Sequence, residues 1–384
     1  MQPEHGEMKT IELAQDFIKN TLTELLNIHS PSGYSDQVVH CVGRKLEQMG
    51  LDFSVTRRGA IRATIPGEHN TFHRALTAHL DTLGAMVSRL KANGRLSVMP
   101  VGTWSSRFAE GARVTVFKES GPCRGTVLPL KASGHIYGDL VNTQPVDWEQ
   151  LEIRIDAPAC CRSDLKDAGF EVGNFVAFDA MPEFTANGFI NARHLDDKAG
   201  VAILLAVAQG FANSSVVLPV DCHFIFTIFE EVGSGASAVV HGDVAEMVTV
   251  DHAPIGPSQN ASEKGVTICM MDQTGPFDYH LSRKLVSLCR THGIDYAQDV
   301  FRYYRSDSAS AIEAGNDTRT ALVGFGVDGS HGYERSHMSS LMAVAQLISR
   351  YLQSEPTFSR DKKEMTSLKG FPHQPSRNPI QIET

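Results

Sequence analysis

The sequence is poor in the features that mark several classes of protein. Its 384 residues include seven cysteines, an odd number with no CxxC pair, so we expect neither a disulfide framework nor a cysteine-based zinc site. No uninterrupted apolar run approaches the roughly 20 residues that cross a bilayer. No basic segment followed by an apolar core stands near the N-terminus. We therefore expect a cytoplasmic protein that does not associate with membranes.

Basic charge is also scarce. The chain has 35 Lys and Arg against 44 Asp and Glu, a formal net charge of −9. Proteins that bind nucleic acids normally show a basic excess or a dense Lys/Arg stripe, so the composition argues against a nucleic-acid partner. What the chain does have is enough length and apolar content for a sizeable core, and 16 histidines.

Hydrophobic periodicity predicts an α/β protein that is interrupted by a β-rich insertion. Helices are expected at residues 10–29, 37–49, 196–212, 281–293 and 339–353, with apolar strands between them. The insertion consists of short β-type segments without a long helix, and one of these segments is 132–140. We divide the chain into four parts. Residues 1–85 are the first part of a catalytic domain, residues 86–186 an inserted β domain, residues 187–355 the second part of the catalytic domain, and residues 356–384 a polar tail.

His79 and Asp81 stand at the end of an apolar strand. Residues two apart on a strand project to the same face, so Asp81 can hold one ring nitrogen of His79 while the other binds a metal ion. Ordinary hydrogen bonding at a strand end is the alternative, because so short a motif also matches by chance.

Asp196 and Asp197 directly precede an apolar helical segment. Acidic residues there can simply complement the helix dipole. In the functional alternative, Asp196 bridges two cations and uses both of its carboxylate oxygens.

Further carboxylates and histidines follow other apolar segments. Glu230 and Glu231 come after a buried strand, Asp251 ends the strand expected at 247–251, and His331 and His337 precede the last helix. Functional groups gather beyond the carboxyl ends of strands in open α/β sheets. Carboxylates with imidazoles suit a pair of divalent cations, and a two-metal centre needs a bridging carboxylate, terminal ligands and a base.

The segments HLDTLG, LDDKAG, FEEVGSGA and VD, in this order, resemble the M42 family of metallo-aminopeptidases within the co-catalytic zinc peptidase clan. The segment LLNIHSPSGYSDQV near the N-terminus is also similar to this family. The resemblance covers roughly residues 10–350 and places the β-rich insertion where M42 proteins carry a small β domain. It implies a mixed-sheet α/β/α catalytic domain with an inserted small all-β domain.

The resemblance also implies roles for individual residues. His79 and Asp251 would bind one metal ion, and Glu231 would bind the second. Asp196, joined to Asp197 by a cis peptide bond, would bridge the two ions. Glu230 would be the general base, with Asp81 orienting His79. The ions would be zinc, with cobalt or manganese as alternatives.

The last ligand is where the chain departs from the family. M42 proteins usually read RYxHSPxE at this point, whereas this chain reads SHGYERSHMSSL. His337 fits best because the final helix follows it at the expected distance. His331, in mid-loop beside two glycines, is the fallback and a candidate substrate-binding residue. The altered context suggests a divergent subgroup, similar to the M42-like peptidases associated with synthesis of N-acetylglutaminylglutamine amide.

Asp307 lies in the segment SDSASA, where M42 proteins have a loop near the substrate. It would hold the substrate's amino end, or it caps a helix that starts at Ser308.

The favoured function is that of an aminopeptidase that removes N-terminal residues from short peptides. An amidohydrolase acting on an N-acylated amino acid or a capped dipeptide is the alternative. A catalytically silent binding or scaffold protein is less favoured, because the base and the bridging carboxylate are both present. The resemblance further implies a homo-oligomer, from dimer to dodecamer.

Overall fold

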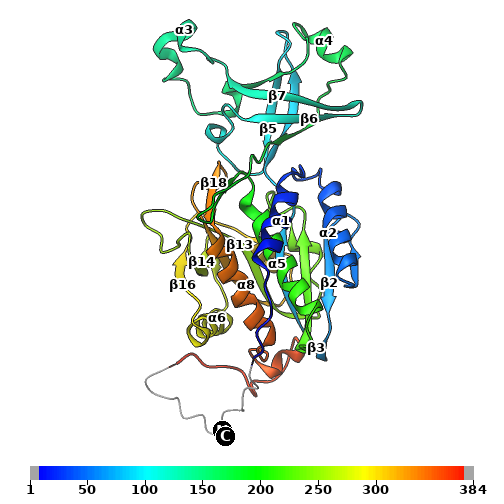
Figure 1. The fold of residues 1–384 in the computed structure, drawn as a ribbon, viewed down its shortest axis with the longest axis vertical. Coiled ribbons are helices and arrows are strands. Elements are labelled where there is room, and N and C mark those ends of the chain that lie inside the picture. Colours follow the sequence, from blue (N-terminus) through cyan, green and yellow to red (C-terminus); the bar gives the residue numbers. More distant parts are fainter. Residues whose placement is uncertain (1–7, 376–384) are drawn as a thin grey trace.

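The computed structural model describes residues 8–375 of the chain. It has two lobes: a lobe built on a large sheet, and a β-barrel that stands at one end of it (Figure 1). The mixed α/β fold with an inserted antiparallel domain is confirmed.

Within residues 8–375 the large sheet has nine strands, in the order β1-β2-β12-β3-β13-β17-β14-β15 with β16 beside β14. Their bounds are β1 Phe53–Val55, β2 Ile61–Ile65, β3 Gly67–His79, β12 Leu218–Thr227, β13 Val244–Pro254, β14 Val266–Asp272, β15 Gly275–Pro276, β16 Tyr296–Val300 and β17 Arg319–Val327. The four central strands β12, β3, β13 and β17 run parallel, whereas β2 and β14 pair antiparallel to them. The carboxyl ends of the parallel strands therefore meet at one edge.

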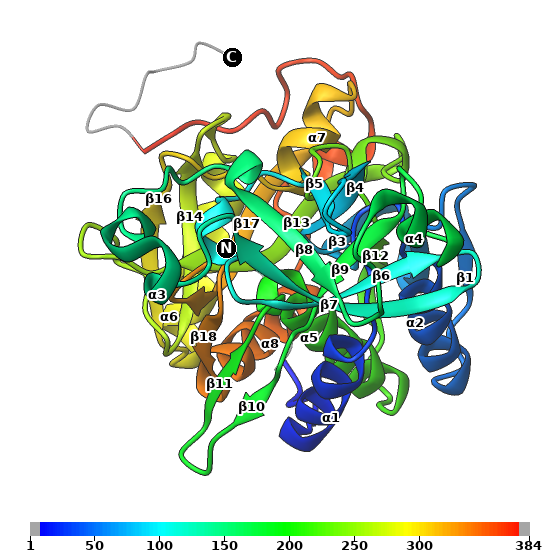
Figure 2. The ribbon, with the colours of Figure 1, turned by 90° about the horizontal axis from the view of Figure 1, so that it is seen from above.

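Helices cover both faces of this sheet (Figure 2). On one face α5 (Leu195–Ala212) and α8 (Met338–Gln353) lie side by side, with α1 (Gln15–Leu26) against α5 and α6 (Tyr279–His292) against α8. The short helices α7 (Asp307–Glu313) and η4 (Ala236–Ala238) lie on the other face, and α2 (Asp36–Gln48) packs beside β2. Helix α5 is buried along nearly its whole length because it is apolar on all sides. All five helices expected from the sequence are present.

The inserted domain is a closed barrel in the order β4-β5-β8-β7-β6-β9. Its strands are β4 Gly84–Leu90, β5 Leu96–Val101, β6 Arg113–Lys118, β7 Gly121–Pro129, β8 Leu151–Ile155 and β9 Phe175–Phe178. Their inward residues, such as Val87, Val116 and Ile153, form a separate core. Two short helices also occur here, α3 (Gly134–Tyr137) and α4 (Arg162–Asp167).

The prediction of a strand at residues 132–140 is wrong. This segment forms α3 and the 3₁₀ turn η2 (Gly138–Val141), and its side chains are mostly exposed. Gly138 has a φ of 55°, which an extended strand cannot contain. The barrel closes without this segment, so no partner strand was left to hold it in an extended conformation.

A small sheet of β10 (Glu183–Phe184), β11 (Phe189–Ala192) and β18 (Glu334–His337) ties the chain leaving the barrel to the segment before α8. The tail that we predicted from residue 356 includes the turn η5 (Ser359–Lys362), where Asp361 pairs with Arg319 on β17 at 2.6 Å. Residues 376–384 of that tail lie outside the described residues, as do residues 1–7. Across residues 8–375, each helix is too short or too polar to cross a membrane.

Candidate active site

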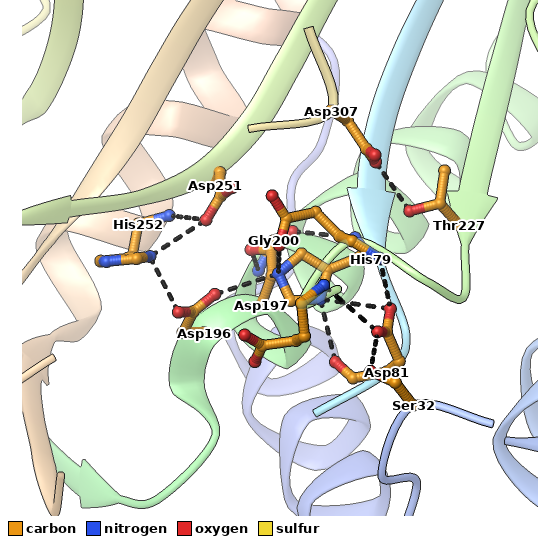
Figure 3. A network of polar contacts seen from close by, with 12 residues as sticks. Ser32, His79, Asp81, Asp196, Asp197, Gly200, Thr227, Asp251, His252 and Asp307 are labelled. Carbon is orange, nitrogen blue, oxygen red and sulfur yellow. Dashed lines mark hydrogen bonds and ion pairs between the residues drawn. The ribbon is translucent and has the colours of Figure 1, made fainter. Parts of the chain in front are cut away.

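Most of the predicted site residues gather at the carboxyl ends of the parallel strands, and Figure 3 shows several of them. His79 is the last residue of β3, and Glu230 and Glu231 follow β12. Asp251 lies inside β13, three residues before its end, because β13 stays paired with β17 as far as Pro254. The first turn of α5 brings Asp196 to the same place from the next element of the chain.

Hydrogen bonds fix the orientation of the His79 ring. Its Nδ1 donates to the backbone carbonyl of Asp81 at 2.9 Å. Since a carbonyl only accepts, the proton of the neutral ring is on Nδ1 and the lone pair is on Nε2. Nε2 lies 3.0 Å from Oδ1 of Asp196. His79 is buried, and Nε2 is the ring nitrogen that faces the carboxylate cluster.

The two oxygens of Asp196 face different histidines. Oδ1 lies 3.0 Å from Nε2 of His79, while Oδ2 lies 3.3 Å from Nε2 of His331 and 3.2 Å from Nδ1 of His252. The peptide bond from Asp196 to Asp197 is cis. Asp197 points to the sheet, where it accepts a hydrogen bond from the His79 backbone N–H at 3.1 Å.

Two groups of potential metal ligands share this aspartate. One consists of His79, Asp196 and Asp251, and the other of Asp196, Glu231 and His331; in each, the ligand atoms lie within 4.8 Å of one another. Imidazole and carboxylate donors suit zinc, manganese or cobalt. The residues present therefore fit a pair of divalent cations.

The Asp81 carboxylate supports the turn after β12, while the backbone carbonyl of Asp81 holds the neighbouring histidine. It accepts hydrogen bonds from the backbone N–H groups of Glu230 and Glu231, at 3.2 and 3.4 Å, and from the hydroxyl of Ser32. His79 is held mainly by the Asp81 backbone carbonyl, because the carboxylate lies 3.7 Å from Nδ1. The Asp81 carboxylate therefore does not hold the His79 ring as we predicted, and it positions the two glutamates instead.

Glu230 stands beside the ligand groups without belonging to them. Its Oε2 lies 3.8 Å from Nε2 of His79. Burial raises the pKa of the Glu230 carboxyl well above its usual value, and the charge of nearby Asp251 adds to this. Such an environment favours a carboxylate that readily takes up a proton.

His337 does not reach the cluster, contrary to our preferred assignment. Its Nε2 donates to the carbonyl of Asn187 at 2.9 Å, and its Nδ1 accepts from the backbone N–H of Ser339 at 3.1 Å. The ring also packs edge-on against Phe189. Both ring nitrogens are thus occupied in capping α8 and joining it to the β10–β11 hairpin.

His331, our fallback residue, lies opposite Asp196 instead of His337. We expected a mid-loop histidine beside glycines to be poorly held, but the loop is a closed hairpin in which Asp328 and Arg335 exchange backbone hydrogen bonds of 2.9 Å. Glu334 then accepts hydrogen bonds from the backbone N–H groups of His331 and Asp196, at 3.0 and 3.2 Å. One buried carboxylate therefore fixes two of the potential ligands.

Asp307, which we considered for substrate binding, is turned inward. Its Oδ2 accepts from the hydroxyl of Thr227 at 2.7 Å and its Oδ1 from the backbone N–H of Ala236 at 2.8 Å. Burial raises its pKa to about 6. The side chain is 1% exposed, and it connects the end of β12 to η4.

Sequence reasoning missed His252 and Glu334. The Nδ1 of His252 lies 3.1 Å from Asp251 Oδ1, and its Nε2 lies 2.8 Å from the hydroxyl of Ser330. Its position directly after Asp251 was the only signal in the sequence. Glu334 had none, because its contact with Asp196 joins segments that are distant in the chain.

A cavity of about 1110 Å³ opens beside this cluster. Its lining includes Asp196, Glu230, Glu231, His252 and His331. It is large enough for a short peptide or a small amide.

Comparisons with known proteins identify the family of the chain. Residues 59–347 match the M42 glutamyl aminopeptidase family. The protein YhfE of Bacillus subtilis (strain 168) is 38% identical over 348 residues, which are 90% of this chain and 99% of YhfE.

Two solved structures share the fold. The TET aminopeptidase of the marine-sediment archaeon Thaumarchaeota archaeon SCGC AB-539-E09 matches with a TM-score of 0.80 at 16% identity, over 88% of this chain and 96% of that one. The TET1 peptidase of Pyrococcus horikoshii, which can assemble into a tetrahedron or a large octahedral shell, matches with a TM-score of 0.76 at 22% identity, over 87% and 99% of the two chains.

Proposed function

Because this chain belongs to the M42 glutamyl aminopeptidase family, and is therefore a peptidase hydrolase, we propose that it removes N-terminal residues from short peptides at a centre of two divalent metal ions. The observation that carries the proposal is the orientation of Asp196, whose two oxygens face His79 on one side and His331 on the other. A carboxylate that bridges two cations requires such an arrangement.

In this proposal His79 and Asp251 hold one ion, Glu231 and His331 hold the other, and Asp196 contacts both. Zinc fits these donors, with cobalt or manganese as alternatives. Two bound cations would polarise a water molecule and the scissile carbonyl. Glu334, Asp81 and the Asp81 carbonyl keep the ligands in place before any substrate binds.

Glu230 is the general base. It accepts a proton from the attacking water and delivers it to the nitrogen of the departing amine. Its buried position near His79, outside both ligand groups, supports this role. The raised pKa of its carboxyl, caused by burial, supports the second step, in which it must carry a proton.

A substrate panel tests the function. Aminoacyl chromogenic amides and their N-acetylated counterparts would be offered to the chelated protein after addition of zinc, cobalt or manganese. We expect hydrolysis of the free-amine substrates only, and only with metal. Preferential cleavage of the acetylated substrates would instead favour the alternative amidohydrolase, and turnover by the chelated protein would contradict the metal centre.

The bridging role is tested separately with Asp196→Asn. A neutral amide bridges two cations poorly, so we expect lower occupancy of both ions by elemental analysis. Two fully occupied ions in this variant would overturn the assignment of Asp196.

We also propose that the chain forms a homo-oligomer. The proposal is supported by the similarity in fold to the TET1 peptidase of Pyrococcus horikoshii, a protein that can assemble into a tetrahedron or a large octahedral shell. Light scattering of the purified protein would test this, and a monomer at all concentrations would contradict it.

A reducing, cytoplasmic location is consistent with the seven cysteines, each of which is a free thiol.

A further inference from the structure

A second group of histidines lies at the opposite end of the sheet from the active site. His73 is on β3, six residues before His79, so roughly 20 Å of strand separates the two. The first part of β3 lies at the end of the large lobe that is remote from the barrel (Figure 1). His223 on the neighbouring strand β12 and Asp243, directly before β13, complete the group.

The register of the strands puts these side chains on one face. His73 is opposite Asp221, two residues before His223 on β12, and His223 is directly opposite Thr64 on β2. Arg74, the next residue on β3, points the other way and donates to the carbonyl of Tyr351 in α8. Since neighbours alternate along a strand, the cluster occupies the face opposite α5 and α8.

Each of the two imidazole rings, of His73 and His223, uses one nitrogen for a hydrogen bond to a residue outside the cluster. The other nitrogen of each ring is directed at the neighbouring ring. His73 Nε2 donates to the carbonyl of Asn70 at 2.9 Å, so in the neutral ring Nδ1 carries the lone pair. His223 Nδ1 lies 2.9 Å from the hydroxyl of Thr64, which can either donate or accept. His73 Nδ1 and His223 Nε2 are 2.7 Å apart, and Asp243 Oδ2 lies 3.5 and 3.7 Å from them.

We propose that His73, His223 and Asp243 form a binding site for a single divalent transition-metal ion of the zinc class, separate from the catalytic centre. Two imidazoles and one carboxylate are common zinc ligands, and a water molecule would supply the fourth position. Each ligand histidine has an oxygen partner on its other nitrogen, which is the usual support for a metal-binding imidazole.

The distances are close to those that zinc requires. With zinc–nitrogen bonds of about 2.0–2.1 Å, tetrahedral ligand atoms lie roughly 3.3 Å apart. The distances from Asp243 Oδ2 to the two ring nitrogens are already about this long. The distance between His73 Nδ1 and His223 Nε2 has to increase by roughly 0.6 Å. The proton that the rings now share would leave as the ion binds.

Asp243 is exposed, and the cluster can be reached from solvent. His73 and Asp243 line a cavity of about 820 Å³ through which an ion can enter. Arg62 donates to Asp243 Oδ2 at 2.6 Å, and a carboxylate has enough lone pairs to keep this partner while binding metal.

Zinc stoichiometry tests the proposal. The full-length protein and its variants would be stripped of metal, dialysed against the same free zinc concentration and measured by elemental analysis. His73→Ala and Asp243→Asn should each bind one zinc fewer per chain than the parent. Their aminopeptidase kcat should stay within about twofold of the parent, because the site is roughly 20 Å from the catalytic histidine. Since only a difference is read, the result does not depend on how many ions the catalytic centre holds.

His69→Ala, an exposed histidine earlier on β3, is the matched control and should keep the parent zinc content. Thr64→Val should weaken binding of this one zinc by about 10–100-fold, because it removes the oxygen partner of His223. Zinc content equal to the parent in both His73→Ala and Asp243→Asn would overturn the site. So would an equal loss in His69→Ala.

Discussion

Glu230 and Glu231 are adjacent in the chain, yet their carboxylates have different neighbours. Glu231 offers an oxygen to the group that contains Asp196 and His331, whereas Glu230 lies 3.8 Å from His79 and outside both ligand groups. Consecutive residues after a strand diverge in direction, which allows one to bind metal and the other to transfer protons. The two roles can be separated by substitution.

We predict that Glu230→Gln lowers kcat by about 10²–10⁴-fold, the usual contribution of a general base. Its metal content should stay at the parent level, because a proton acceptor is removed and no ligand is lost. Steady-state kinetics and elemental analysis would be carried out in parallel. Glu231→Gln is the matched control and should lose one ion; a less than tenfold effect of Glu230→Gln would contradict its role.

The two late histidines give a second residue-level prediction. His331→Ala should lose one metal ion per chain and its activity, because His331 faces Asp196 at 3.3 Å. His337→Ala should keep its metal, since its ring nitrogens bind Asn187 and Ser339. It should lose about 1 kcal/mol of stability with the helix cap. Measuring the metal content and melting temperature of the two variants would show which histidine binds metal. Metal loss in His337→Ala alone would restore our original assignment of His337 as the ligand.

At the level of elements, Asp81 joins the end of β3 to the turn after β12. Its carboxylate accepts both backbone N–H groups of the glutamate pair, so it holds the base and a ligand at a fixed distance from His79. Helix α8 is joined to the rest of the fold in a similar manner by His337.

We predict that Asp81→Asn weakens metal binding by about 10–100-fold, the usual cost of removing outer support from a metal site. The amide retains one acceptor oxygen and presents an NH₂ group to a backbone donor, so the turn must shift. A zinc titration of the stripped protein measures the affinity. Ser32→Ala, which removes one partner of Asp81 and leaves its charge, should have a smaller effect; an unchanged affinity in Asp81→Asn would contradict the role.

At the scale of the whole molecule, a buried ion pair fastens α8 and the following segment to the sheet. Arg74 Nε lies 2.9 Å from Glu246 Oε2, and the guanidinium also donates to the carbonyls of Tyr351 and Glu355. Burial alone would raise the pKa of Glu246, but the charges of Arg74 and Lys284, together with the hydrogen bonds from Thr357, outweigh burial and lower the pKa to about 2. Both side chains are fully buried.

This pair predicts how stability depends on pH. The carboxylate contributes stability above its unfolded pKa of about 4.3, and the contribution is lost as the pH falls towards 2. Glu246→Gln should therefore be less stable than the parent by about 3–5 kcal/mol at pH 7, because it leaves a buried charge unpaired. The difference should shrink as the pH falls below about 4.

Unfolding of both proteins at a series of pH values would measure this difference. Glu68→Gln, at an exposed position on β3, is the control and should match the parent throughout. A destabilisation of Glu246→Gln that is independent of pH would contradict the ionic contribution.

The sequence by itself determined the order of the elements and most of the site. Apolar periodicity predicted α5, α6 and α8. The residues at the ends of apolar strands supplied His79, Glu230 and Glu231, and the residues directly before an apolar helix supplied Asp196, because each of these signals lies within a few residues. The resemblance to the M42 family added the roles that we propose for them.

Only the tertiary structure decided which late histidine faces Asp196. His331 reaches it because a hairpin and the buried carboxylate of Glu334 hold its loop, while His337 caps α8. The turn of residues 134–141 lies outside the strands that close the barrel, and its Gly138 has a φ of 55°. For the two histidines, the decisive contacts are those of Glu334 with Asp196 and of His337 with Asn187. These contacts join segments that meet only after folding, so local pattern could not identify them.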